Sequence, residues 1–522
     1  MKEKGITLIA LIVTIIILII LAGITIGVLI GDEGLIGNAN DAKEQTEIAN
    51  EKEIVDRATI NAMGNNPRGN IVEDELQNEL DKITNVGDTD VEDNGEEFEV
   101  VFVNTNRYYT VDKQGDIIDE GKIVIDKSPG DITKDENGDD IEEGKPFEIW
   151  CIEDLVAFSN MVNGSGIILE NSKAIEINTS TNFSNKTVEL KTNLNFKSKY
   201  SYADSERTDF GNINGDENDG NTLMNEMTTG TGFKPIGTTK NSFIGTFNGN
   251  QNVLYNIYEN QEDLAGLFLL INSNTIIKNL EITGEITSSN SMAGGIVASV
   301  SSSIYSGNIV NCYNKCNVNG NTYAGGIIGH AYAVDVELDN CYNSGNITGK
   351  IAAGILSRNG GDRIKTIINN CFNIGNITGT IESTSGGILG EVTTMTLQVN
   401  NSYNLGKIRA DKYAGGMIGY SRYTVNINNS YNAGKIYPSG KADIIVPEIW
   451  NNKINLNNFF YDNSNLIDGV TIYNNNAIPF QNSKEEINKI VNLLNSFKDD
   501  NDNYPSNWNR WKLGENGYPI FE

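Results

Sequence analysis

Short apolar clusters separated by glycine and asparagine recur through residues 243–437 with a period near thirty residues. One half of each unit reads Ala-Gly-Gly followed by aliphatic residues. The other half reads Asn-(Cys/Ser)-(Tyr/Phe)-Asn, then a glycine and an isoleucine. The first asparagine of this second motif stands at Asn311, Asn340, Asn370, Asn401 and Asn429, so the steps between copies are 29, 30, 31 and 28 residues. Clusters this short predict about three strands per unit rather than helices.

A unit of this size cannot bury a core alone, but stacked coils pair each backbone group with the coil above and below. We therefore expect a mainly β chain whose residues 243–442 form a parallel β-solenoid of about six coils. Asparagine side chains at matched positions should stack into amide ladders. Corner glycines such as Gly375 are expected to adopt the positive φ of tight turns. A β-sandwich or a propeller is the alternative, although the unit is short for a four-stranded blade.

The Ala-Gly-Gly-Ile element, as at 324–327, and the Asn-Cys-Tyr-Asn element, as at 340–343, resemble the GLUG-type repeats of bacterial surface proteins. The resemblance covers about two hundred residues. It implies a repeat protein displayed at the cell surface.

The N-terminus places a short charged stretch before a long apolar run. Residues 6–30 contain no charged side chain and would form a helix of about 37 Å, which is enough to span a bilayer. We expect a single-pass membrane protein with a cytoplasmic N-terminus and its bulk outside, in contact with lipid through residues 6–30. A plain anchor helix that is never processed is the alternative.

The residues Lys4-Gly5-Ile6-Thr7-Leu8-Ile9 are similar to the leader and mature start of type IV prepilins and pseudopilins. The resemblance implies that a prepilin peptidase cuts after Gly5 and methylates Ile6. It also implies other pilin or pseudopilin subunits as partners. Ala10 stands where the major subunits of that family usually carry glutamate, which favours a minor or tip position over ordinary incorporation into a filament shaft.

Residues 31–125 have the pattern of a pilin-like spine and head. Helical composition at 39–63 and 72–83 is followed by three short strand patterns, at 98–103, 108–111 and 116–118. The acidic stretch 126–146, which is punctuated by proline and glycine, predicts a linker.

Both flanks of the repeats are expected to cap the solenoid, because an open end would expose unpaired backbone. The N-terminal cap is residues 147–242, with strands predicted at 147–151, 187–190 and 194–196 and a helix at 153–162. The C-terminal cap is residues 443–522, with a helix at 483–497 and an aromatic tail. An aromatic sugar-binding platform is the alternative for that tail.

The distribution of charge along the chain limits the possible partners. The chain has 522 residues, 39 basic against 69 acidic, for a net charge of -30. Residues 32–144 hold 32 acidic and 10 basic side chains, whereas residues 243–442 hold 12 of each. Nucleic acid is therefore excluded as a partner, and the repeat block is neutral.

The residue types limit the chemistry. His330 is the single histidine, which excludes His-Glu-x-x-His zinc sites and histidine-dependent triads within this chain, and separates it from the large zinc peptidases that contain GLUG-like segments. Cys312, Cys341 and Cys371 share one repeat position and should form a column of buried free thiols. No Cys-x-x-Cys pair is present, so we expect neither a zinc site nor any other cofactor.

One loop is rich in oxygen ligands. Asp209, Asn212, Asn214 and Asp216 are weak calcium candidates, because the loop lacks the full EF-hand spacing and its terminal glutamate. A solvated loop is the favoured interpretation.

These features favour a cell-surface binding or adhesion protein, not an enzyme, that presents a neutral solenoid to a glycan or protein partner. A polysaccharide-active β-helix enzyme and a passive structural spacer are the alternatives. An enzyme would need clustered acids and bases, and the nearest approach in the repeats is formed by two stretches about one coil apart: Asp335, Glu337, Asp339 and Arg358, Asp362, Arg363, Lys365.

Overall fold

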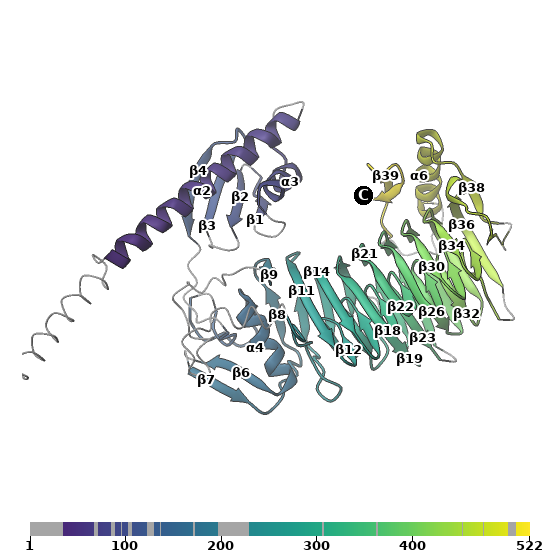
Figure 1. Cartoon of the computed structure of the whole chain (residues 1–522), viewed down its shortest axis with the longest axis horizontal. Helices are drawn as coiled ribbons and strands as arrows, with labels where there is room; N and C mark the ends of the chain where they lie inside the picture. Colours follow the sequence, from purple (N-terminus) through teal and green to yellow (C-terminus); the bar gives the residue numbers. More distant parts are fainter. Residues whose placement is uncertain are drawn as a thin grey trace, which may run out of the picture. The chain divides into compact units, whose positions relative to one another are not determined.

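The computed structural model describes residues 35–66, 71–84, 89–95, 97–102, 107–122, 130–135, 137–170, 173–196, 229–304, 307–361, 364–450, 453–472, 474, 476–499 and 508–522. They form two compact units, which divide near residue 123 (Figure 1). Within these ranges no helix is both long enough and apolar enough to cross a bilayer. The expected leader site Gly5–Ile6, the apolar segment 6–30 and the calcium-loop candidates at 209–216 lie outside the described residues.

The first unit is a long helix, a short helix and an antiparallel sheet with strands in sequence order. Its elements are α2 (Leu35–Asn65), α3 (Glu73–Ile83), β1 (Thr89–Asp93), β2 (Glu97–Phe102), β3 (Arg107–Asp112) and β4 (Ile117–Lys122). Both predicted helices and the three predicted strands are confirmed. Strand β1 was not predicted, because four of its five residues are polar and only Val91 contributes an apolar side chain to the core.

The apolar face of α2 builds the core of this unit. Val55, Ala58 and Ala62 are fully buried and pack in one cluster with Phe98 and Tyr109 of the sheet. The Tyr109 hydroxyl donates to Glu51 at 2.8 Å, which fixes the helix on the sheet.

The second unit is a parallel β-solenoid of about eight turns, two more than the repeats predicted. One face is a six-stranded sheet of β13 (Phe268–Ile271), β16 (Val297–Val300), β19 (Ile328–Tyr332), β23 (Leu356–Gly360), β27 (Leu389–Thr393) and β32 (Ile418–Ser421). The remaining faces belong to a 26-stranded sheet that winds around the axis. Its strands within the repeats are β10 (Thr246–Asn248), β11 (Val253–Gln261), β12 (Leu264–Ala265), β14 (Ile276–Ser288), β15 (Met292–Gly294), β17 (Ile309–Asn314), β18 (Asn317–Gly325), β20 (Val336–Asp339), β21 (Tyr342–Asn343), β22 (Ile347–Ala353), β24 (Lys365–Asn369), β25 (Phe372–Asn373), β26 (Ile377–Gly386), β28 (Thr396–Asn400), β29 (Tyr403–Asn404), β30 (Ile408–Ala410), β31 (Tyr413–Gly415), β33 (Val425–Asn432), β34 (Ile436–Pro438) and β35 (Lys441–Asp443).

One coil contains four strands rather than the predicted three, as in β20, β21, β22 and β23. Equivalent residues pair in parallel from coil to coil, for example Tyr342 with Phe372 and Ala352 with Ser385. The aliphatic residue that follows each Ala-Gly-Gly points into the core, as Ile327 does at 0% exposure.

The corner asparagines, and not the glycines that follow the Asn-x-aromatic-Asn motif, adopt the left-handed backbone. Asn340, Asn370 and Asn401 have φ values of 50°, 51° and 46°, a region that asparagine tolerates better than most residues. Gly375, which was expected to take positive φ, does not. It is glycine because a Cβ there would lie 1.9 Å from the carbonyl oxygen of Gly345 in the preceding coil.

The predicted amide ladders are present. In the buried ladder each side chain donates to the next coil, with Asn343 to Asn373 at 2.7 Å and Asn373 to Asn404 at 2.8 Å. Beside it, Cys312, Cys341 and Cys371 form the expected column of buried free thiols, which Ser402 and Ser430 continue. These columns satisfy polar groups that would otherwise be unpaired in the core.

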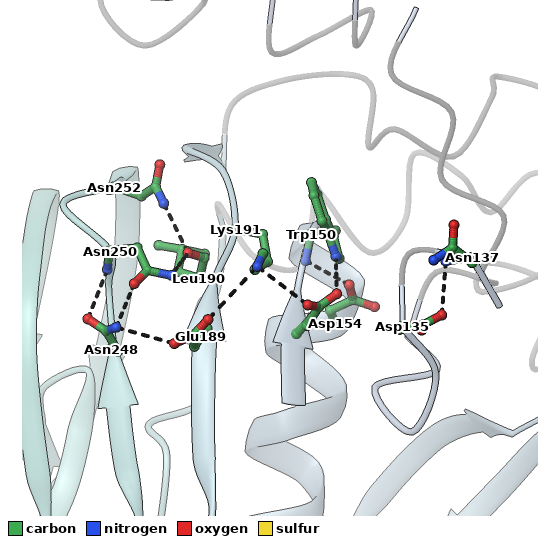
Figure 2. A network of polar contacts seen from close by, with 11 residues as sticks. Asp135, Asn137, Trp150, Asp154, Glu189, Leu190, Lys191, Asn248, Asn250 and Asn252 are labelled. Atoms are coloured by element: carbon green, nitrogen blue, oxygen red, sulfur yellow. Dashed lines mark hydrogen bonds and ion pairs between the residues drawn. The ribbon is translucent and has the colours of Figure 1, made fainter. Parts of the chain in front are cut away.

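The N-terminal cap contains β5 (Phe147–Ile149), α4 (Ile152–Asn163), β6 (Gly166–Glu170), β7 (Lys173–Ile177), β8 (Thr187–Leu190) and β9 (Leu194–Asn195). Helix α4 places Phe158 against the rings of Phe183 and Phe243, with centroids 5.0 and 5.3 Å apart. The buried carboxylate of Asp154 accepts the backbone N–H of Trp150 at 2.9 Å, and Lys191 lies 3.9 Å from Glu189 (Figure 2). The first coil is thus closed by a packed helix, as predicted.

The C-terminal region differs from the expected end cap. The solenoid continues through β36 (Ile454–Asp462), β37 (Val470–Thr471) and β38 (Ile478–Phe480), with the 3₁₀ turn η2 (Asn463–Asn465) between them. Helix α6 (Lys484–Asp499) and the hairpin of β39 (Trp511–Leu513) and β40 (Pro519–Phe521) pack on a side of the solenoid. They cover a stack of aromatic rings in which Phe372 and Tyr403 lie 4.6 Å apart. Without this cover the apolar stack would face solvent, so the packing stabilises the fold.

Candidate functional site

The Ala-Gly-Gly motifs turn the chain inward on one side of the solenoid. A Cβ at Gly325 would lie 1.9 Å from the carbonyl oxygen of Ile328, and Gly386 and Gly415 stand in the same position relative to Leu389 and Ile418. Only glycine permits so close an approach of two backbone segments. Each motif therefore forms a tight concave corner between the 26-stranded and six-stranded sheets.

Two columns of outward side chains face each other across this corner. The first column precedes the motif and the second follows it, and the residues of each column pair in parallel from coil to coil. The first is Met292, Tyr323, Ile351, Thr384, Tyr413 and Lys441, and the second is Ser299, His330, Arg358, Glu391 and Tyr420. The rings of Tyr413 and Tyr420 lie 5.7 Å apart across the corner, and those of Tyr323 and His330 lie 4.8 Å apart.

The C-terminal part of this corner holds an open cavity of about 870 Å³. We call it the groove, and define it by its lining residues: Lys350, Ile351, Ile381, Glu382, Thr384, Glu391, Asp411, Lys412, Tyr413, Tyr420, Glu448 and Trp450. Trp450 is 61% exposed, whereas Tyr413 and Tyr420 are half-buried. The groove therefore offers three aromatic side chains to a ligand.

A bulge in β26 forms one rim of the groove. Gly379 pairs with Gly349, but the next paired residue is Thr384 with Ile351, so that three extra residues project from the coil. Ile381 in this bulge is 80% exposed. The irregular repeat thus widens the wall of the corner where the cavity lies.

Three of the carboxylates that line the groove form ion pairs. Arg358 Nε lies 3.2 Å from Glu391, Lys350 lies 3.8 Å from Glu382, and Lys441 contacts Glu448. Burial and the charge of Glu391 raise the pKa of Tyr420 above its ordinary value, so its hydroxyl stays protonated and can donate a hydrogen bond.

The side chain of His330 lies in this corner and contacts another aromatic ring. Its imidazole lies flat on Tyr323, with an interplanar angle of 8°. Burial and the nearby guanidinium of Arg358 lower the pKa of His330 to about 4, which keeps the ring neutral near pH 7.

The residues considered for polysaccharide chemistry do not form one site. Asp335, Glu337 and Lys365 come together: Lys365 pairs with Glu337, and its backbone N–H donates to Asp335 at 2.8 Å. Asp339 instead accepts the amide of Asn370 at 2.6 Å, and Arg358 lies in the corner of the groove. Asp362 and Arg363 lie outside the described residues.

No group of three or more histidine, cysteine or carboxylate side chains suited to a metal ion occurs in the part of the chain that the structure describes.

The groove itself was not predicted from the sequence, although a signal for it exists. Tyrosine precedes the Ala-Gly-Gly motif at Tyr323 and Tyr413, and the three-residue insertion before Ser385 breaks the repeat length.

No protein-family model matches the sequence, and no curated protein matches it. The structure is similar to a solved structure from Bacteroides ovatus titled a "putative immunoglobulin A1 protease", at 16% sequence identity and a TM-score of 0.44. The similarity covers 73% of this chain and 93% of the other. A likeness at this level assigns neither an activity nor a substrate to the chain described here.

Proposed function

We propose that this chain is a cell-surface binding protein and that the groove holds an extended glycan. The observation that carries the proposal is the placement of Tyr413, Tyr420 and Trp450 around one open cavity between paired charges. Aromatic faces pack against the apolar faces of sugar rings, and polar neighbours fix the orientation of the hydroxyl groups. Because Tyr413 and Tyr420 are held in the corner by their contact with each other, little side-chain entropy is lost on binding.

The N-terminal segment supports display outside the cell. Residues 6–30 would cross the membrane with the N-terminus in the cytoplasm, and the resemblance of the leader to prepilins adds a prepilin peptidase and related subunits as partners. The helix and antiparallel sheet of the first unit are consistent with a pilin-like head. A subunit carrying residues 147–522 would collide with neighbours packed along a shaft, so a minor or tip position fits better.

Glycan-array binding by the full chain tests the proposal. Tyr413→Ala and Tyr420→Ala should each weaken binding at least about tenfold, the usual effect of removing a central aromatic contact. Tyr332→Ala is the matched control, because Tyr332 is 62% exposed on the six-stranded sheet but does not line the groove. Equal losses in all three variants, or no glycan binding at all, would refute the proposal and favour a passive spacer.

The same preparation distinguishes binding from catalysis. We expect no release of reducing or unsaturated sugars from acidic polysaccharides, with or without calcium. If sugars are released, and the release disappears in Asp335→Ala or Arg363→Ala, the chain is an enzyme rather than a binding protein.

A further inference from the structure

We infer that the groove takes an uncharged glycan chain that lies along the solenoid axis, with one sugar ring for each of four successive coils. The inference rests on the proposed function and specifies the class and the direction of the ligand. Three features of the groove carry it: its extent along the axis, its closed end and its balance of charge.

The extent follows from the register of the first column. Ile351, Thr384, Tyr413 and Lys441 pair in succession, and the residues that line the groove belong to these four coils. Coils in such a stack are spaced by about 4.8 Å, which is close to the advance of one pyranose ring in an extended β-1,4-linked chain. Each ring of a chain parallel to the axis therefore meets the same column position of a successive coil, whereas a chain across the axis does not.

The two ends of the groove differ. At the coil before Ile351, Tyr323 lies flat on His330, and Arg358 donates to the Tyr323 hydroxyl at 3.2 Å, so that side chains fill the corner. At the other end Trp450 is exposed, and its ring is the last aromatic contact along the groove. The filled end limits the number of rings that the groove can hold.

The balance of charge indicates a neutral ligand. Three of the four lining acids have a basic ion-pair partner: Glu382 with Lys350, Glu391 with Arg358, and Glu448 with Lys441. The fourth acid, Asp411, is next to the lining base Lys412 in the sequence, so the opposite charges around the groove balance. A uronate or an amine on the ligand would have to compete with these ion pairs. Paired carboxylates and ammonium groups can still accept and donate hydrogen bonds to hydroxyl groups.

Titration of the full chain with oligosaccharides of two to six units tests the inference. The neutral probes are β-1,4-linked glucose and N-acetylglucosamine oligomers, and the acidic probe is a β-1,4-linked mannuronate series. We expect the affinity for the better neutral series to rise up to about four units and then to level off. At four units it should exceed the affinity for mannuronate by at least about tenfold, and it should change little between low and high salt.

Trp450→Ala tests the register. Without the indole of Trp450, the affinity should level off at about three sugar units instead of four. Tyr332→Ala should change neither the affinity nor the length at which it levels off. Levelling at two units, tighter binding of the acidic series, or an unchanged plateau in Trp450→Ala would overturn the inference while leaving glycan binding intact. If none of the three series binds, the proposed function fails together with it.

Discussion

Replacing Glu259 by glutamine should remove one loss of stability that the solenoid otherwise suffers between about pH 4.5 and 8. Glu259 lies on β11 with 0% of its surface exposed, at the position that Ile286 and Val318 occupy in the next two coils. One carboxyl oxygen accepts the backbone N–H of Gly266 at 2.8 Å, and the other has no hydrogen-bond partner in the described structure. Burial is the main cause that raises the pKa of Glu259 to about 8.

The sign and size of the effect follow from proton linkage. In the folded state the carboxyl group keeps its proton up to about pH 8, whereas in the unfolded chain it loses the proton near its ordinary pKa of 4.5. The raised pKa therefore stabilises the fold fully below pH 4.5, and that contribution is lost as the pH rises toward 8. A difference of about 3.5 pKa units corresponds to at most about 5 kcal/mol, at 1.36 kcal/mol per unit. Glutamine keeps the hydrogen bond to Gly266 and has no proton to lose.

Urea denaturation of the full chain at pH 5, 7 and 9 provides the assay. The free energy of unfolding of Glu259→Gln minus that of the wild type should increase from pH 5 to pH 9, because this difference cancels the contributions of other groups such as His330. At pH 9 the variant should be the more stable protein. Glu285→Gln is the matched control, because Glu285 is exposed on the adjacent strand β14. Because coils of a solenoid can unfold separately, the transition of the first coils should also be followed by limited proteolysis. Parallel pH profiles for the wild type and Glu259→Gln would refute the reasoning.

Three further outcomes are expected. Gly375→Ala should destabilise the solenoid by several kcal/mol in thermal melting, since its Cβ would lie 1.9 Å from a backbone oxygen, whereas Gly64→Ala, with nothing within 4 Å, should not. Asn373→Ala should cost about 2–4 kcal/mol because three buried hydrogen bonds are lost, while Asn376→Ala on the exposed ladder should cost less than about 1 kcal/mol; equal costs would contradict the role of the buried ladder. Mass spectrometry of the mature protein should find a methylated Ile6 at the N-terminus, and an intact leader would exclude prepilin processing.

The sequence predicts the repeat architecture well because each coil repeats the same motifs and therefore the same short strands and turns. The spacing of Asn340, Asn370 and Asn401 already fixes which residues stack, and the ladders follow from it. The backbone conformation at the corners is not fixed by that pattern, since asparagine and glycine both tolerate positive φ. The structure shows that asparagine takes the positive φ at the corner, whereas Gly375 allows the close approach of the preceding coil.

The groove is harder to predict, because it depends on contacts between residues on different strands of neighbouring coils. Tyr413 and Tyr420 are seven positions apart, and their contact requires that the intervening glycines bend the chain inward rather than outward. The path of the C-terminal segment is also not contained in the repeat pattern. Trp511 would suit an end cap equally well, and only the ring stack at Tyr403 gives it a lateral partner.

The C-terminal segment has a mechanical consequence. Coils that contact only their neighbours can be peeled from one end in sequence. Asn509 donates its side-chain amide to Asn340 and its backbone N–H to Asn370, while the indole of Trp511 donates to Asn401 at 2.7 Å. Three coils are thus fastened by one short segment that runs across them. These three coils cannot separate from one another until the bonds to that segment break, so they resist a force along the axis as a block.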